Sequence, residues 1–257
     1  MQTLTYVTRD NQPLYGDLYA PPKEEPAPAV LCVHGGSWRG GTRGTYRHLG
    51  PFLASAGYAV FAIDYRLVEN GRHRHPAAAE DVRAAAQFLK THAAELKIDP
   101  NRIALMGDSA GAHLAALIAL TEPGLARVLV GVYGIYDLAA HYTYECSTRP
   151  HENAAEALLG VSLCDDRRAY FDASPLSYVT RRPNAPAVLL AWGTVDDIVD
   201  PRQSEAFRDA LKAAGFYVRT VVLMAPHYWM SEPLEERGSL AGFFASRLLR
   251  FLDERLL

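Results

Sequence analysis

The sequence predicts a three-layer α/β domain built on a mostly parallel sheet, with an antiparallel hairpin of two strands at its N-terminal end. Two observations carry this prediction. Strand-like apolar runs alternate with helical segments along most of the chain, and two strand-like runs, 4–7 and 14–19, open it. Strands that alternate with helices pair in parallel, because each helix crosses over to the next strand. We expect a single domain over residues 1–257, a length that one α/β domain can reach.

The individual elements follow from apolar patterning. Strands are predicted where short apolar runs are rich in β-branched and aromatic residues, at 29–33, 58–63, 102–106, 128–132, 187–192 and 217–223. Helices are predicted where apolar residues recur at helical spacing, at 77–96, 109–120, 202–213 and 240–252. Residues 133–186 show little strand signal and are predicted to form a cap-like insertion. Its aromatic side chains would either line a pocket or pack the insertion onto the sheet.

Composition excludes several classes of protein. The chain has 49% hydrophobic and 21% charged residues and a formal net charge of −3, which is ordinary for a folded globular protein. It lacks the basic balance of a nucleic-acid-binding protein, and no apolar run is long enough to span a membrane. The three cysteines match no zinc-binding spacing, and we recognise no signal peptide. A cytoplasmic protein without metal or cofactor is therefore expected, and its oligomeric state is left open.

A serine stands where a predicted strand passes into a predicted helix. Residues 107–111 read Gly-Asp-Ser-Ala-Gly and lie between the strand at 102–106 and the helix at 109–120. A sharp turn there lifts Ser109 out of the sheet, and the flanking glycines permit an approach that a larger residue would block. The helix N-terminus also offers free N–H groups to a developing negative charge. In this context the pattern predicts that Ser109 is a nucleophile.

A glycine pair follows the predicted strand 29–33 directly. Gly35 and Gly36 stand in the run His-Gly-Gly-Ser-Trp, and we expect their backbone N–H groups to point into the cavity beside Ser109. Together with the N–H of Ala110, they would stabilise the negative oxygen of a tetrahedral intermediate. The sequence therefore predicts an oxyanion hole at this end of the sheet.

A serine nucleophile needs a general base, and the order of elements selects one of the nine histidines. His227 follows the last predicted parallel strand, 217–223, where the base is expected when the nucleophile comes first in the chain. His113 is nearer to Ser109 in sequence, but lies on the following helix and is interpreted as a packing or hydrogen-bonded histidine. The acid should follow the preceding strand, where Asp196 and Asp197 are adjacent. The residues alone leave either aspartate open as the partner of the imidazole.

Four motifs together carry a resemblance to known enzymes. They are His-Gly-Gly at 34–36, Asp-Tyr-Arg-Leu at 64–67, Pro-Ala-Ala-Ala-Glu-Asp at 76–81 and Gly-Asp-Ser-Ala-Gly at 107–111. With them the chain resembles the hormone-sensitive-lipase-like carboxylesterases of the α/β-hydrolase superfamily. The Gly-Gly-x-Trp run that ends at Trp38 is also similar to kynurenine formamidase-like hydrolases.

The resemblance implies an α/β-hydrolase fold and selects Asp196 over Asp197 as the acid. The triad it implies is Ser109, Asp196 and His227, with an oxyanion hole from Gly35, Gly36 and Ala110. Candidates at all of these positions argue against a catalytically dead binding module.

The expected activity is the cleavage of small-molecule carboxylic esters through an acyl-enzyme intermediate. Short or compact acyl groups are favoured, because we find no amphipathic lid that would sit on a lipid surface, and an aromatic insertion would narrow the entrance. Trp38, Tyr136 and Tyr142 are the candidate substrate-binding residues. An arylformamidase acting on N-formylkynurenine-like formamides is the alternative, since flat aromatic walls would also suit an aromatic ring.

Overall fold

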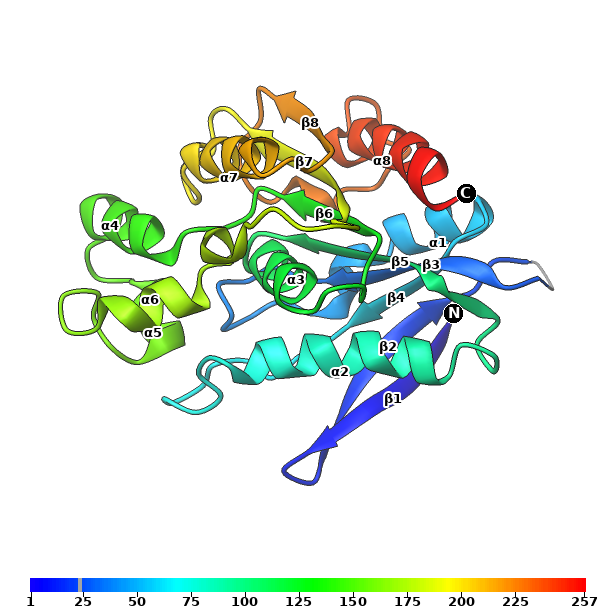
Figure 1. The fold of residues 1–257 in the computed structure, drawn as a ribbon, viewed down its shortest axis with the longest axis horizontal. Helices are drawn as coiled ribbons and strands as arrows, with labels where there is room; N and C mark the ends of the chain where they lie inside the picture. The colour runs from blue at the N-terminus through cyan, green and yellow to red at the C-terminus, as the bar shows by residue number, and fades with distance from the viewer. Residues whose placement is uncertain (23–24) are drawn as a thin grey trace.

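One twisted sheet with helices on both faces organises the protein, as the computed structural model shows (Figure 1). The structure describes residues 1–22 and 25–257. The strand order is β1-β2-β4-β3-β5-β6-β7-β8; β2 pairs antiparallel with β1 and β4, and the pairs from β4 onward are parallel. The strands are β1 Gln2–Arg9, β2 Gln12–Tyr19, β3 Ala27–Val33, β4 Ala59–Ile63, β5 Ile98–Asp108, β6 Val128–Val132, β7 Ala187–Gly193 and β8 Val218–Leu223. The predicted α/β-hydrolase fold, with a mostly parallel sheet and an N-terminal hairpin, is confirmed.

The handedness of the crossovers places the helices on the two faces. The chain steps from β3 to β4 in one direction and then from β4 through β5 to β8 in the other, so right-handed connections put α1 on one face and α2, α3 and α7 on the opposite face. Helices α2 and α3 contact each other, and α8 contacts β6 and β7 (Figure 1). These helices are α1 Leu49–Ser55, α2 Ala77–Thr91, α3 Ala110–Thr121, α7 Arg202–Ala213 and α8 Leu240–Leu256.

The core lies between the central strands and these two helical layers. Every residue of β3, β4 and β6 is buried. Strands covered on both faces need apolar side chains at successive positions, which explains why the sequence shows continuous apolar runs there rather than alternation. The parallel strands therefore present their carboxyl ends at a single edge of a rigid, buried sheet.

Several elements differ from the sequence-based prediction. The helix predicted over 77–96 ends at Thr91, and the strand predicted over 102–106 runs from Ile98 to Asp108. The short helix α1 was not predicted, because its sequence, Leu-Gly-Pro-Phe-Leu-Ala-Ser, contains two residues of poor helix propensity. Its stability comes from packing, since α1 contacts β2 and β4.

Residues 133–186 fold into short helices and add no strand to the sheet. The helices are α4 Leu138–Thr148, α5 Ala154–Leu159, α6 Arg167–Ala173 and the 3₁₀ turn η2 Pro175–Tyr178. The side chains of Asp137, Asn153 and Asp166 accept hydrogen bonds from backbone N–H groups and so cap α4, α5 and α6. Helix α4 contacts α5 and α6 within the insertion, and contacts of η2 with α3 join the insertion to the rest of the fold (Figure 1).

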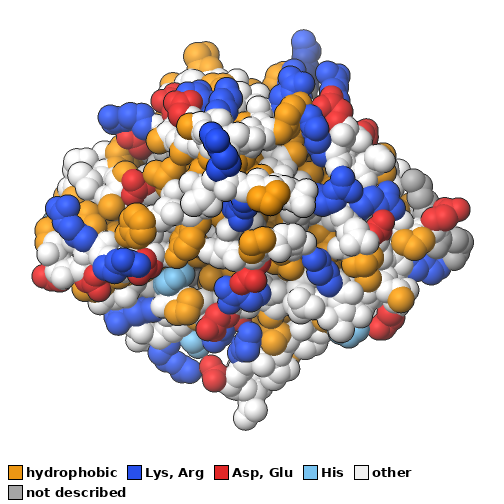
Figure 2. All heavy atoms as spheres, viewed as in Figure 1, with side chains coloured by type: hydrophobic (Ala, Val, Ile, Leu, Met, Phe, Trp, Pro, Cys, Tyr) orange, Lys and Arg blue, Asp and Glu red, His pale blue; other side chains and the backbone are white. Residues whose placement is uncertain are grey.

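The surface carries charges of both signs. Figure 2 shows Lys and Arg side chains interspersed with Asp and Glu on the face in view, with hydrophobic side chains between them. Within residues 1–22 and 25–257, no helix is long and apolar enough to cross a membrane.

A buried ion pair joins the chain after β4 to α2. The carboxylate of Asp81 has no exposed side-chain surface and accepts hydrogen bonds from Arg66 Nε (2.8 Å), Arg66 Nη2 (2.9 Å) and the Arg66 backbone N–H (3.0 Å). Arg9 Nε on β1 lies 3.3 Å from the same carboxylate. Two of the motifs noted in the sequence, at 64–67 and 76–81, thus meet in a single contact.

Removal of this carboxylate should be much more harmful than removal of its neighbour. Asp81→Ala leaves the mostly buried Arg66 guanidinium without its main partner, and we expect a loss of about 3–5 kcal/mol in the free energy of unfolding. Glu80 also pairs with Arg66, at 3.0 Å, but its side chain is 45% exposed, so Glu80→Ala should cost less than about 1 kcal/mol. Urea unfolding of both variants tests this; equal losses would contradict the assigned role of Asp81.

Candidate active site

The serine of the Gly-Asp-Ser-Ala-Gly motif occupies a strained turn between β5 and α3. Ser109 has φ 53° and ψ −122°, a conformation that costs a non-glycine residue roughly 1–3 kcal/mol. Both flanking glycines are required by close packing: a Cβ on Gly107 would lie 2.2 Å from the carbonyl carbon of Gly111, and one on Gly111 would lie 2.0 Å from the Val33 oxygen. The backbone thus holds the serine hydroxyl at the carboxyl edge of the sheet.

An aspartate from the loop after β7 and a histidine from the loop after β8 complete a hydrogen-bonded chain with this serine. His227 Nε2 lies 3.0 Å from Ser109 Oγ, and His227 Nδ1 lies 2.6 Å from Asp196 Oδ2. All three residues are buried. With Nδ1–H donating to the carboxylate, Nε2 is left to accept the serine proton, so the arrangement fits a Ser-His-Asp triad.

The structure separates the two neighbouring aspartates. Asp196 Oδ1 accepts hydrogen bonds from the backbone N–H groups of Ile198 and Val199, both at 2.9 Å, which leaves Oδ2 directed to the imidazole. Asp197 is exposed, and its backbone oxygen accepts a hydrogen bond from Tyr144. The loop after β7 therefore brings Asp196, and not Asp197, to His227.

Two tyrosines pack against the imidazole of His227. The Tyr133 ring lies with its centroid 4.3 Å from that of His227, and Tyr228 makes an edge contact at 4.5 Å. The Tyr133 hydroxyl also accepts a hydrogen bond from the Met230 N–H, which ties the end of β6 to the loop that carries His227. The orientation of His227 thus depends on packing as well as on Asp196.

The glycine loop after β3 is anchored by buried polar side chains. The Gly35 N–H donates to Asp108 Oδ1 (3.2 Å), and the Tyr65 hydroxyl donates to the His34 oxygen (2.9 Å). The ring of Tyr65 also stacks on that of His34, with centroids 4.3 Å apart. Burial lowers the pKa of His34, so its imidazole is kept neutral as part of the loop structure.

Gly36 and Gly41 allow the loop to fold back on itself. Their φ angles are +116° and +85°, and a Cβ on either would lie 2.3 Å from a backbone oxygen, that of Gly40 or of Gly35. Only glycine fits both requirements. The loop can therefore approach Ser109 closely enough to bound one side of the site.

A small pocket of about 190 Å³ opens beside Ser109. Its walls come from the glycine loop, the serine turn and the strand ends, and its lining residues are Gly35, Gly36, Gly41, Thr45, Asp108, Ser109, Tyr133, Tyr228 and Ser231. Sequence reasoning missed Tyr133, Tyr228, Thr45 and Ser231, and it did not single out Gly41 or Asp108 as pocket residues. The first two had a signal, because Tyr133 directly follows a predicted strand and Tyr228 follows His227. Thr45 and Ser231 had none.

The structure does not place the three candidate substrate-binding aromatics in the lining of this pocket. Trp38 has no exposed surface, and its Nε1–H donates to His113 Nδ1 (3.2 Å). Tyr136 is also fully buried and stacks on Phe207 of α7. The Tyr142 hydroxyl is hydrogen-bonded to Ser162 within the insertion. Of the two interpretations of the insertion's aromatics, the structure favours packing over pocket lining for Tyr136 and Tyr142.

His113 is part of the scaffold, as its position on the helix after Ser109 predicted. Its Nε2 lies 2.9 Å from the Ala173 oxygen, so the hydrogen on Nε2 faces that carbonyl and Nδ1 accepts from Trp38. Burial lowers the pKa of His113 to about 3, and the ring stays neutral. It joins the glycine loop, α3 and the end of α6.

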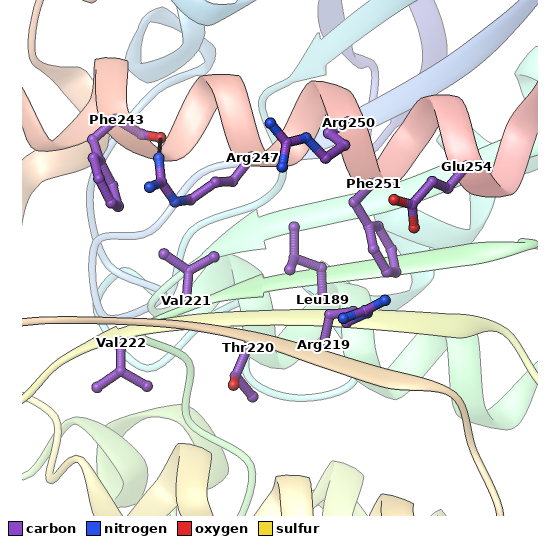
Figure 3. Close-up of a pocket in the computed structure, with 10 residues that line it drawn as sticks. All are labelled: Leu189, Arg219, Thr220, Val221, Val222, Phe243, Arg247, Arg250, Phe251 and Glu254. Atoms are coloured by element: carbon purple, nitrogen blue, oxygen red, sulfur yellow. Dashed lines mark hydrogen bonds between the residues drawn. The ribbon is translucent and has the colours of Figure 1, made fainter.

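A wider groove of about 530 Å³ lies elsewhere, between β8 and α8 (Figure 3). Val221 and Leu189 point toward α8, which contributes Phe243, Arg247 and Arg250. None of the triad residues lines it. Within the described part of the chain, no three His, Cys, Asp or Glu side chains are grouped so that they could hold a metal ion.

Comparison with known proteins identifies relatives of this arrangement. The BD-FAE family matches residues 16–211. Esterase LipC of Mycobacterium tuberculosis is 32% identical over 204 residues, which cover 74% of this chain and 49% of LipC, so the chain spans about half the length of that relative. Ethyl acetate hydrolase of Pseudomonas putida is 30% identical over 239 residues, covering 86% of this chain and 72% of that protein.

Solved structures agree with the fold. The esterase Est2 of Thermogutta terrifontis superposes with a TM-score of 0.80 at 23% identity, over 98% of this chain and 91% of Est2. An acetyl ester-xyloside bifunctional hydrolase from Caldicellulosiruptor lactoaceticus gives a TM-score of 0.82 at 20% identity, over 98% and 96% of the two chains. The chain therefore belongs to the BD-FAE family, among the α/β-hydrolases that resemble hormone-sensitive lipase.

Proposed function

We propose that this protein is a serine hydrolase that cleaves carboxylic esters of short or compact acyl groups through an acyl-enzyme intermediate. The observation that carries the proposal is the continuous hydrogen-bonded chain from Ser109 Oγ through His227 to Asp196, whose serine lines the small pocket. Two relatives of the chain are esterases by name, which supports ester hydrolysis over other acyl transfers.

In the proposed mechanism Ser109 Oγ attacks the ester carbonyl while His227 Nε2 takes its proton. Asp196 stabilises the imidazolium that forms, through the 2.6 Å contact to Nδ1. The leaving alcohol receives that proton, and the acyl group stays on Ser109. A water molecule, activated in turn by His227, then releases the carboxylic acid.

We assign the stabilisation of the tetrahedral oxyanion to the N–H groups of Ala110 and Gly36. Ala110 is the first residue of α3, so its N–H has no acceptor within the helix and lies at the positive end of the helix dipole. Gly36 lines the same pocket as Ser109. Gly35, the third residue suggested by the sequence, donates its N–H to Asp108 and is assigned an indirect role.

The size of the pocket supports a preference for compact acyl groups. A space of about 190 Å³ between the glycine loop and Tyr133 is smaller than the range of roughly 300–1,000 Å³ that is common for ligand sites. No specific observation favours a formamide over an ester, so formamide hydrolysis enters only as an outcome of the test below.

A series of p-nitrophenyl esters from acetate to palmitate, assayed beside N-formylkynurenine, tests this function. We expect the highest kcat/KM at the short end, because longer chains exceed the pocket. Ser109→Ala is the background control and should lower kcat by roughly 10⁴- to 10⁶-fold with little change in thermal unfolding. Highest kcat/KM at a long chain would contradict the compact-acyl preference. Turnover of the formamide far above every ester would move the assignment to a formamidase.

The two adjacent aspartates offer a matched pair of variants. Asp196→Asn should lower kcat by about 10⁴-fold, because an amide favours the imidazole tautomer that cannot accept the serine proton. Asp197→Asn should leave kcat within about threefold of wild type, since its exposed side chain does not contact His227. Steady-state kinetics on p-nitrophenyl acetate distinguishes them, and the reverse ranking would exchange the two roles.

A further inference from the structure

A buried carboxylate beside the nucleophile has no part in the mechanism described so far. Asp108 is the last residue of β5, directly precedes Ser109, and lines the same pocket. Only 6% of its surface is exposed. Burying an unpaired carboxylate costs free energy, so the hydrogen-bond partners of Asp108 indicate what its carboxylate does.

The carboxylate is bonded to the glycine loop and to the turn that follows it. Asp108 Oδ1 accepts hydrogen bonds from the Gly35 N–H (3.2 Å) and from the Tyr46 hydroxyl (2.8 Å), which comes from the 3₁₀ turn η1 Arg43–Tyr46. A Cβ on Gly35 would lie 2.7 Å from Asp108 Oδ2 and 3.0 Å from Ser109 Cβ. The loop is thus pressed against the carboxylate, and the position of Gly35 defines that of the next peptide N–H, which belongs to Gly36.

We propose that Asp108 is a positioning residue for ester hydrolysis, whose ionised carboxylate holds Gly35 and so directs the Gly36 N–H at the oxyanion. The inference rests on the proposed function. An ionised carboxylate only accepts hydrogen bonds and makes stronger ones than a neutral acceptor, so it suits two converging donors. A protonated carboxyl would carry a donor of its own and would hold the loop less firmly.

The environment of Asp108 makes this hold sensitive to pH. Burial raises the pKa of Asp108 to about 6, while the hydrogen bond from Tyr46, the charge of His227 and the Gly35 N–H act in the opposite direction. The carboxylate is therefore ionised above about pH 6, and the hold is lost as the pH falls through that value. The titratable side chains that face it are Cys32 on β3, Tyr46 on η1, Tyr65 after β4, Tyr133 after β6 and His227 after β8.

The thiol and the three phenols among these groups stay neutral near pH 6. Burial raises the pKa of each of them above its ordinary value. Protonation of Asp108 is consequently the event among these groups that should weaken the hold on the loop at acid pH. The low-pH limb of kcat/KM in the wild-type enzyme should then include a component that falls near pH 6.

Asp108→Asn removes the negative charge but keeps the shape of the side chain, and the amide oxygen can still accept both hydrogen bonds. On p-nitrophenyl acetate between about pH 5 and pH 8, we expect kcat to fall by roughly 10²-fold, as for loss of an oxyanion donor, with KM within about threefold of wild type. The component of the low-pH limb that falls near pH 6 should be absent in the variant, because an amide does not titrate there. Wild-type kcat together with an unchanged low-pH limb would overturn the proposal.

Tyr46→Phe keeps the proposal testable if Asp108→Asn does not fold. It removes the hydroxyl that lies 2.8 Å from Asp108 Oδ1 and 3.0 Å from the Val33 oxygen, and it should lower kcat several-fold at unchanged KM. Tyr58→Phe is the matched control, since Tyr58 is equally buried and donates to Asp253 Oδ1 (2.7 Å) away from the site. An equal fall in kcat in both variants would mean a general loss of stability and would overturn the positioning role.

The failure of this inference can be told apart from the failure of the proposed function. If Ser109→Ala hydrolyses esters as well as the wild type does, the function itself is wrong. If Ser109→Ala is inactive and Asp108→Asn behaves as the wild type, only the role of Asp108 is refuted.

Discussion

The in-register parallel pairing of β3 with β5 is the interaction on which the site depends. Val33 pairs with Gly107, so the two strands end side by side, with the glycine loop leaving one and the serine turn leaving the other. Gly111 then passes so close to the Val33 oxygen that no side chain fits between them. A slip of one residue in this register would turn every side chain of the strand to the opposite face and would separate the loop from Ser109.

The alignment of strand ends continues across the sheet. Asp108 pairs with Val132 on β6, and Gly193 on β7 pairs with Leu223 on β8, so the strand ends line up in sequence along one edge. The loops that follow them carry Tyr133, Asp196 and His227. Because the strands are buried on both faces, hydrophobic packing of the sheet keeps Tyr133, Asp196 and His227 in position at its edge. The polar contacts of Asp108, Tyr65 and His113 then restrain the loops, which have no ladder of their own.

Much of this arrangement could be predicted from sequence, and the reason is local. The alternation of strands and helices and the motif around Ser109 each depend on residues that are close in the chain, so pattern alone indicates them. His227 and Asp196 required one further step, the order of strands in a family of similar folds. The choice of Asp196 over Asp197 came from the resemblance, and the structure explains it by two backbone N–H groups that hold one carboxylate oxygen.

The residues that line the pocket beside Ser109 could not be predicted in the same way. Trp38 and Tyr136 are aromatic residues near the expected site in sequence, but their side chains point into the core, toward His113 and Phe207. Thr45 and Ser231 reach the pocket from segments whose path depends on long-range packing between η1 and the short turn η3 Trp229–Ser231. Side-chain direction at such positions follows from tertiary contacts, and periodicity contains no information about them.

Covalent labelling tests the central claim, that Ser109 is a nucleophile activated by His227, most directly. The native protein is incubated with diethyl p-nitrophenyl phosphate, and the intact mass and the digested peptides are then measured. The account predicts one diethylphosphoryl group per chain, located on Ser109, with no labelling in Ser109→Ala and far slower labelling in His227→Ala. An adduct on another residue, or an active esterase that resists labelling at Ser109, would contradict it.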